Sequence, residues 1–142
     1  MGTVNYLLDT NAVIFYLKGG LPQPDGVFRA FTPSESAFLD GIFDVAPQCS
    51  IVTQIELMAK SNPGGQEATK IKTILRNSVI FEIGQDLVEE TIRVRRDHRL
   101  KMPDALIAAT ALVQDLALIS GNFHDFGKVL GLKFINLFAL PV

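Results

Sequence analysis

The chain has 142 residues, a length that suits one domain, and we expect residues 1–142 to form a single one. Hydrophobic residues make up 48% and charged residues 20%, a composition that supplies a buried core and excludes an intrinsically disordered chain. The net charge of −2 excludes the strongly basic surface of many DNA-binding proteins, although an enzyme built around carboxylates and a metal ion fits this charge.

Short apolar runs and helical segments alternate along the chain. The first half predicts a strand over 4–8, a helix over 12–18 closed by glycines, a loop over 21–33, a helix over 34–45, a strand over 49–52 and a helix over 53–60. The second half predicts a helix over 67–75, a strand over 79–83, helices over 85–99 and 103–112, and strands over 116–119 and 132–135. This alternation predicts a three-layer α/β/α fold with a central parallel sheet of about five strands.

The sequence carries no sign of export or membrane insertion. Residues 1–6 lack the basic and then apolar run of a secretion signal, and charges interrupt every apolar stretch. Cys49 is the only cysteine, which excludes an intrachain disulfide and a thiolate zinc site. We therefore expect a cytoplasmic protein with no membrane partner.

Four carboxylates stand next to predicted strand ends or helix starts, and each has a structural alternative. Asp9 ends the first strand and could cap the next helix. Glu56 follows Thr53 at the spacing of a capping box. Asp104 lies in the first turn of a helix, where negative charge is favourable, and Asp125 lies in a polar turn that would suit a solvated surface residue.

Together the four acids predict a site. Strand carboxyl ends and helix amino ends share one edge of such a sheet, so these side chains can converge there. Carboxylates brought together in a water-poor place repel one another unless a cation compensates them. A hard divalent ion such as Mg²⁺ or Mn²⁺ suits oxygen ligands better than zinc does.

The segments around these acids resemble a known family. Residues 7–14, Leu-Leu-Asp-Thr-Asn-Ala-Val-Ile, look like the opening motif of PIN domains, in particular toxins of the VapC type. Residues 53–57 resemble the second acidic motif of that family, and residues 120–126 resemble the last. The most specific similarity is that of residues 103–112, Pro-Asp-Ala-Leu-Ile-Ala-Ala-Thr-Ala-Leu, to the third motif.

The resemblance implies a PIN-like fold and an Mg²⁺- or Mn²⁺-dependent endoribonuclease, the toxin of a toxin–antitoxin pair. Its expected partners are an RNA substrate, a cognate antitoxin protein and a second copy of the chain. By resemblance, the metal-binding and catalytic residues are Asp9, Glu56, Asp104 and Asp125. Supporting polar roles fall by the same resemblance to Asn11, Ser120 and Asn122.

Two departures from the family and two alternatives bear on this interpretation. The segment over 20–48 is longer than in the minimal toxin, and Asn122 stands where many relatives have Asp, which predicts a weaker hold on a second metal ion. Residues 9–13 also resemble the nucleophile loop of haloacid-dehalogenase-type phosphatases, but those enzymes need an Asp at the position of Asn11. The other alternative is a non-catalytic interaction module in which the acids are helix caps.

Two surface features complete the expectations. The basic run after residue 92 predicts a solvated helix face, or else a contact for RNA phosphates or an acidic antitoxin segment. It comprises Arg93, Arg95, Arg96, Arg99 and Lys101. Apolar residues of the early helices exceed what a small sheet needs, and we expect a groove for an antitoxin helix or a homodimer contact there. They are Ile14, Phe15, Leu17, Phe38, Ile42 and Phe43.

Overall fold

The structure, a computed structural model, describes residues 5–142. Its central sheet has five strands in the order β5-β4-β1-β6-β7, and every pairing between them is parallel. The strands are β1 (Tyr6–Leu8), β4 (Gln48–Ser50), β5 (Val79–Phe81), β6 (Ala117–Ser120) and β7 (Phe134–Asn136). The predicted parallel sheet is confirmed, while residue 4 of the first predicted strand and residues 1–4 of the amino-terminal segment lie outside the described residues.

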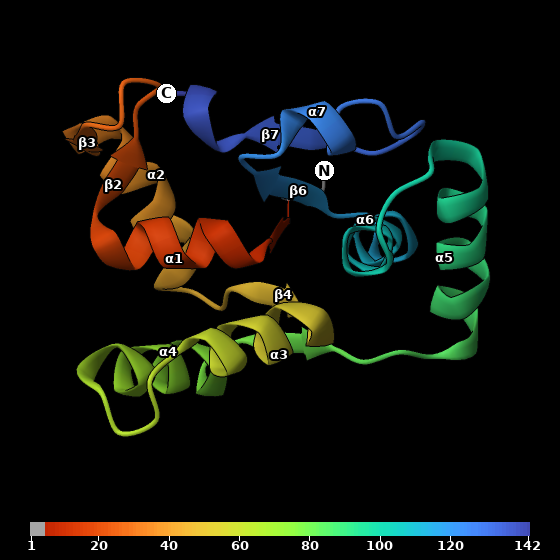
Figure 1. The fold of residues 1–142 in the computed structure, drawn as a ribbon, viewed down its shortest axis with the longest axis horizontal. Helices are drawn as coiled ribbons and strands as arrows, with labels where there is room; N and C mark the ends of the chain where they lie inside the picture. The colour runs from red at the N-terminus through yellow and green to blue at the C-terminus, as the bar shows by residue number, and fades with distance from the viewer. Residues whose placement is uncertain (1–4) are drawn as a thin grey trace.

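Helices cover both faces of this sheet (Figure 1). They are α1 (Thr10–Lys18), α2 (Pro33–Phe43), α3 (Ile51–Lys60), α4 (Gln66–Arg76), α5 (Gln85–His98), α6 (Met102–Gln114) and the short α7 (Phe123–Phe126), followed by a 3-10 turn at Leu137–Ala139. Gly19, with a left-handed φ of 79°, ends α1 as the glycine pair predicts. In residues 5–142, no helix is long and apolar enough to cross a membrane.

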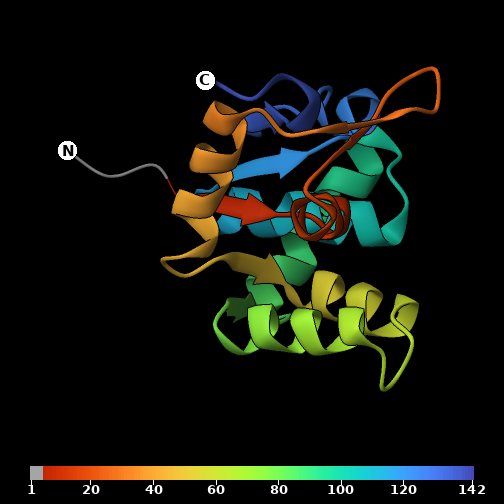
Figure 2. The ribbon, with the colours of Figure 1, turned by 90° about the vertical axis from the view of Figure 1, so that its left-hand side faces the viewer.

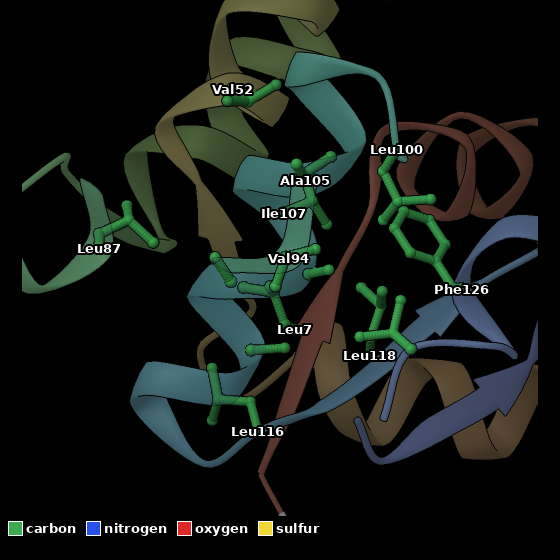
Figure 3. Packing of buried hydrophobic residues seen from close by; sticks show 14 residues of the cluster. Leu7, Val52, Leu87, Val94, Leu100, Ala105, Ile107, Leu116, Leu118 and Phe126 are labelled. Carbon is green, nitrogen blue, oxygen red and sulfur yellow. The ribbon is translucent and has the colours of Figure 1, made fainter. Parts of the chain in front are cut away.

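Alternating side chains of the central strands divide the core in two. Leu7 and Leu118 point to one face, where they pack with Val94 of α5 and Phe126 of α7 (Figure 3). The next residue of β1, Leu8, belongs to the cluster on the other face, which is covered by α1, α2 and α4. The strands are buried on both sides, and this is why they read in the sequence as continuous apolar runs.

The predicted loop over 21–33 is wrong in part, because it holds an antiparallel hairpin. Strand β2 (Gly20–Pro22) pairs with β3 (Phe28–Ala30) across a turn that contains Gly26 at a φ of 86°. A Cβ on Gly20 would lie 2.1 Å from the carbonyl oxygen of Arg29, so the close pairing requires glycine there. Three-residue strands with prolines show no apolar alternation, which hides them in the sequence.

The strands β1, β4 and β6 point the same way, and α1 begins at the tip of β1 (Figure 2). Their carboxyl ends therefore form one edge of the sheet. The helices α1 and α3 start at this edge, directly after β1 and β4. This arrangement brings the acids that follow the strands into one place.

Candidate active site

Three of the four acids line one cavity at the carboxyl edge of the sheet. Asp9 follows β1 directly, Glu56 lies in the second turn of α3, and Asp104 lies in the first turn of α6. The cavity has a volume of about 100 Å³ and is called the acid cavity below. It is lined by Asp9, Thr10, Asn11, Glu56, Lys60, Asp104, Ile107, Asn122 and Phe126.

Asp9 is at once a helix cap and a wall of the acid cavity. It is the N-cap of α1, and its Oδ1 accepts a hydrogen bond from the Ala12 N–H at 2.8 Å. Burial raises the pKa of this carboxyl to about 6, against the opposing effects of the Ser120 hydroxyl and the Ala12 N–H. The charges of Asp104 and Glu56 raise it further, so neighbouring carboxylates add to the effect of burial.

Glu56 lines the acid cavity and does not cap its own helix. The capping-box interpretation is wrong: α3 starts at Ile51, and its cap is Ser50, whose Oγ accepts from the Val52 N–H at 3.1 Å. Ser50 is both the last residue of β4 and the N-cap of α3, so Thr53 lies inside the helix and not at its cap. The Glu56 carboxylate instead accepts a hydrogen bond of 2.5 Å from the hydroxyl of Thr10, and this bond ties α3 to α1.

Asp104 lies half-buried in the wall of the acid cavity, in the first turn of α6 as the sequence predicts. Its pKa is raised, first by burial and then by the charges of Asp125 and Glu56, while Lys101 lowers it. The aspartate therefore lies among like charges that outweigh its one cationic neighbour. A helix amino end favours its charge, but it does not neutralise it.

Asp125 lies beside this group rather than on the cavity wall. The predicted polar turn is the short helix α7, with Asn122 as its N-cap. Asn122 accepts from the Asp125 N–H at 3.3 Å and donates from Nδ2 to the Asp125 carboxylate at 3.0 Å, and its own N–H donates to Ser120 Oγ at 3.0 Å. Ser120, Asn122 and Asp125 thus form one hydrogen-bonded chain between β6 and α7, next to Asp9 and Asp104.

The family model for the PIN domain matches residues 6–129. The chain belongs to the PIN domain family. Members of this family are nucleases, and this makes the acid cavity of the PIN domain its candidate active site. Membership leaves the haloacid-dehalogenase alternative without support.

Solved structures of similar fold come from bacterial toxin–antitoxin complexes. A toxin–antitoxin complex from Klebsiella pneumoniae is 24% identical with a TM-score of 0.71, and the match covers 96% of this chain and 100% of that one. DNA-bound VapBC from Salmonella typhimurium is 17% identical with a TM-score of 0.73, covering 95% and 99%. VapBC2 from Rickettsia felis, bound to a promoter DNA fragment, is 19% identical with a TM-score of 0.72, covering 94% and 98%. A search of curated proteins gave no match.

The donor groups of the PIN domain's acid cavity suit a hard divalent cation. Asp9, Glu56 and Asp104 offer carboxylate oxygens, and Asn122 adds an amide to the wall. No thiol or imidazole lines the cavity, so the chemistry of zinc is not favoured. Among residues 5–142, no three His, Cys, Asp or Glu side chains already stand close enough to grip one ion. The oxygen donors therefore line the same cavity, but in the positions described they lie too far apart to coordinate one ion together.

The sequence interpretation missed two polar residues of this PIN domain's site. Thr10, buried beside Asp9, carries the hydrogen bond to Glu56. Lys60 lies four residues after Glu56 on α3 and lines the same cavity. The spacing of Lys60 was a usable signal, because residues four apart share one face of a helix. The Thr10–Glu56 pairing joins positions 46 apart and had no local signal.

The basic run is divided: Lys101, the N-cap of α6, lies close enough to lower the pKa of Asp104, whereas the arginines of α5 do not line the acid cavity. Arg93 pairs with Glu90 and Asp97 of its own helix α5. Arg95 and Arg96 line a second, larger hollow of about 630 Å³ between α5 and α6, called the apolar cavity below. Its other walls are Ile83, Val88, Thr91, Ile92, Met102 and Leu106.

The apolar side chains of α1 and α2 are partly buried in this PIN domain. All six that we expected at a groove pack against the core cluster on that face of the sheet while staying partly exposed. Tyr16 adds a ring stacked on Phe43, with centroids 3.8 Å apart. Much of this surface therefore serves the fold itself, and a docking groove there stays a prediction.

Proposed function

We propose that the protein is an endoribonuclease that hydrolyses RNA phosphodiester bonds with Mg²⁺ or Mn²⁺. The observation that supports this most is the placement of Asp9, Glu56 and Asp104, from three separate segments, around one cavity of a PIN domain. Helix capping alone would not require them to share a space. Capping explains Asp9 in part, but it does not explain why Glu56, which caps no helix, lines the same cavity as Asp9 and Asp104.

The acids would hold the cation, with Asp125 beside them. The raised pKa values of Asp9 and Asp104 support this proposal, since a divalent ion would offset both burial and mutual repulsion. A bound Mg²⁺ or Mn²⁺ supplies Lewis acidity and charge neutralisation to phosphodiester hydrolysis. We propose a site for one ion, because Asn122 stands where many relatives have an Asp that could help to hold a second.

The surrounding residues orient these acids. The Ala12 N–H fixes one oxygen of Asp9, and the Thr10 hydroxyl fixes one oxygen of Glu56, so each carboxylate keeps its remaining lone pairs for the cavity. The Ser120 hydroxyl lowers the pKa of Asp9 through a hydrogen bond, and the Asn122 side chain donates a hydrogen bond to the Asp125 carboxylate. Asn11 lines the cavity mouth as an exposed polar group. Partners of this kind commonly set the affinity of a metal site.

We further propose that the protein is the toxin of a toxin–antitoxin pair. Solved structures of similar fold include complexes of such pairs, and the matches cover those chains almost completely. The partners would be an antitoxin protein and a second copy of the chain, with the partly exposed apolar side chains of α1 and α2 as one candidate contact.

Cleavage of single-stranded RNA by the purified protein, free of antitoxin, tests the proposed activity. We expect cleavage with Mn²⁺ or Mg²⁺, none after EDTA, and none from Asp104→Asn, whose circular dichroism should match the wild type. Cleavage by Asp104→Asn at the wild-type rate would contradict the assignment of the site. A wild type that neither cleaves RNA nor responds to metal would favour the non-catalytic interaction module.

A further inference from the structure

Lys60 carries the only positive charge among the described residues that line the acid cavity. It is the last residue of α3, one helical turn beyond Glu56, and therefore on the same face of that helix. In the part of the chain that the structure describes, no carboxylate lies within salt-bridge distance of its ammonium group. The cavity thus presents a free cation at its rim.

The other charged walls of the cavity repel the proposed substrate. Asp9, Glu56 and Asp104 would all push away the phosphates of an approaching RNA strand, and a metal ion between them offsets that repulsion only at the reacting group. Phosphates on either side need a separate cation. Lys60 is placed to supply it, since an ammonium on a flexible stem is a common ligand of phosphate.

A helix-end role does not account for this position. Lys60 lies in the last turn of α3, where a cation is favourable, and Lys18 lies in the equivalent place in α1. Both are exposed, yet only Lys60 lines the acid cavity. Lys18 is therefore a matched control: it has the same chemistry and the same helix-end position without the cavity.

We infer that Lys60 is a substrate-binding residue whose ammonium group contacts a phosphate of the RNA strand next to the one that is cleaved. The inference rests on the proposed ribonuclease function and deepens it. It assigns recognition of the substrate backbone to α3, the helix that also carries Glu56, and not to the arginines of α5. Such a contact depends on the negative charge of the phosphate and does not distinguish one base from another.

Binding of a short fluorescein-labelled single-stranded RNA, followed by anisotropy in EDTA, tests this. All proteins carry Asp104→Asn, which keeps the RNA intact and removes one repelling carboxylate. Lys60→Gln should weaken binding about tenfold, the effect of losing one charged contact. It should also reduce the slope of log affinity against log salt by about 0.7, the value for one phosphate on a single strand. Lys60→Arg and Lys18→Gln should bind like the parent.

The outcomes separate this inference from the function on which it rests. Equal affinity and equal salt slope for Lys60→Gln and the parent would overturn the role of Lys60 alone. Equal RNA binding with tighter Mn²⁺ binding in the wild-type background would also overturn it, since Lys60 would then be an internal counterion of the acids. A parent with no affinity for RNA, either in EDTA or with Mn²⁺, would overturn both proposals. An equal loss of RNA affinity in Lys18→Gln would also overturn the role of Lys60, because overall charge alone would then explain the loss.

Discussion

The acid cavity and the apolar cavity differ both in volume and in the kind of side chain that lines them. The apolar cavity is about six times larger, at about 630 Å³ against about 100 Å³, and its walls are aliphatic side chains with Arg95 and Arg96. Among the described residues that line it there is no carboxylate, so it lacks the ligands that a divalent cation prefers. The acid cavity is small, but three carboxylates from distant segments meet there. We therefore place the proposed chemistry in the smaller cavity, where the oxygen donors are.

The largest difference between the two cavities should be in activity. Glu56→Gln and Arg96→Gln introduce the same side chain, one in each cavity. Glu56→Gln should lower the RNA cleavage rate by about a hundredfold or more, because even the partners of metal ligands commonly account for ten- to hundredfold. Arg96→Gln should cleave at the wild-type rate. Comparable losses in the two variants would mean that the acid cavity has no special role.

A smaller effect is expected from the hydrogen bond that orients Glu56. Thr10→Val removes the hydroxyl and keeps the shape, so Mn²⁺ affinity by calorimetric titration should fall about ten- to hundredfold, and Thr10→Ser should restore it. Thr53→Val is the matched control on α3: its buried hydroxyl has no hydrogen-bond partner among the described residues. That variant should keep its Mn²⁺ affinity and melt slightly higher. Unchanged affinity in Thr10→Val would show that Glu56 needs no support.

The third effect is on stability and depends on pH. Folding raises the pKa of Asp9 from 3.8 to about 6, so the folded state favours the protonated form. Without metal, its charge costs nothing below about pH 4, costs progressively more up to pH 6, and costs about 3 kcal/mol above that. Asp9→Asn keeps an oxygen for the Ala12 N–H and removes this cost. In EDTA it should melt higher than the wild type at pH 8, with the advantage gone near pH 4.

Asp25→Asn provides the comparison for that titration. Asp25 also accepts a backbone hydrogen bond, from the Val27 N–H at 2.9 Å, but it is exposed in the hairpin turn. Its side chain is not buried, so its replacement should not raise the melting temperature at pH 8 as Asp9→Asn does. If Asp9→Asn followed the same curve as Asp25→Asn, the acid cavity would not be destabilising its own carboxylate.

The difference between contacts local in the sequence and contacts between distant segments explains what the sequence could predict. Asp9 and Asp104 were recognisable because each lies next to a boundary that local pattern marks: a strand end and a proline-led helix start. The start of α3 was misplaced because Ser50 serves both strand and helix. The pairing of Thr10 with Glu56 depends on how α1 packs on α3, and only the folded chain brings them together.

The melting temperatures of wild type and Asp104→Asn, with and without Mn²⁺, test the central claim most directly. In EDTA the variant should melt higher, because relief of repulsion from Asp125 and Glu56 outweighs the helix-dipole stabilisation of about 0.3–1 kcal/mol that it loses. Mn²⁺ at a hundredfold excess over Kd should stabilise the wild type by about 2.7 kcal/mol and reverse the order. A wild type whose melting temperature does not respond to Mn²⁺ would contradict a metal site in the acid cavity and leave Asp104 as a residue that serves its helix alone.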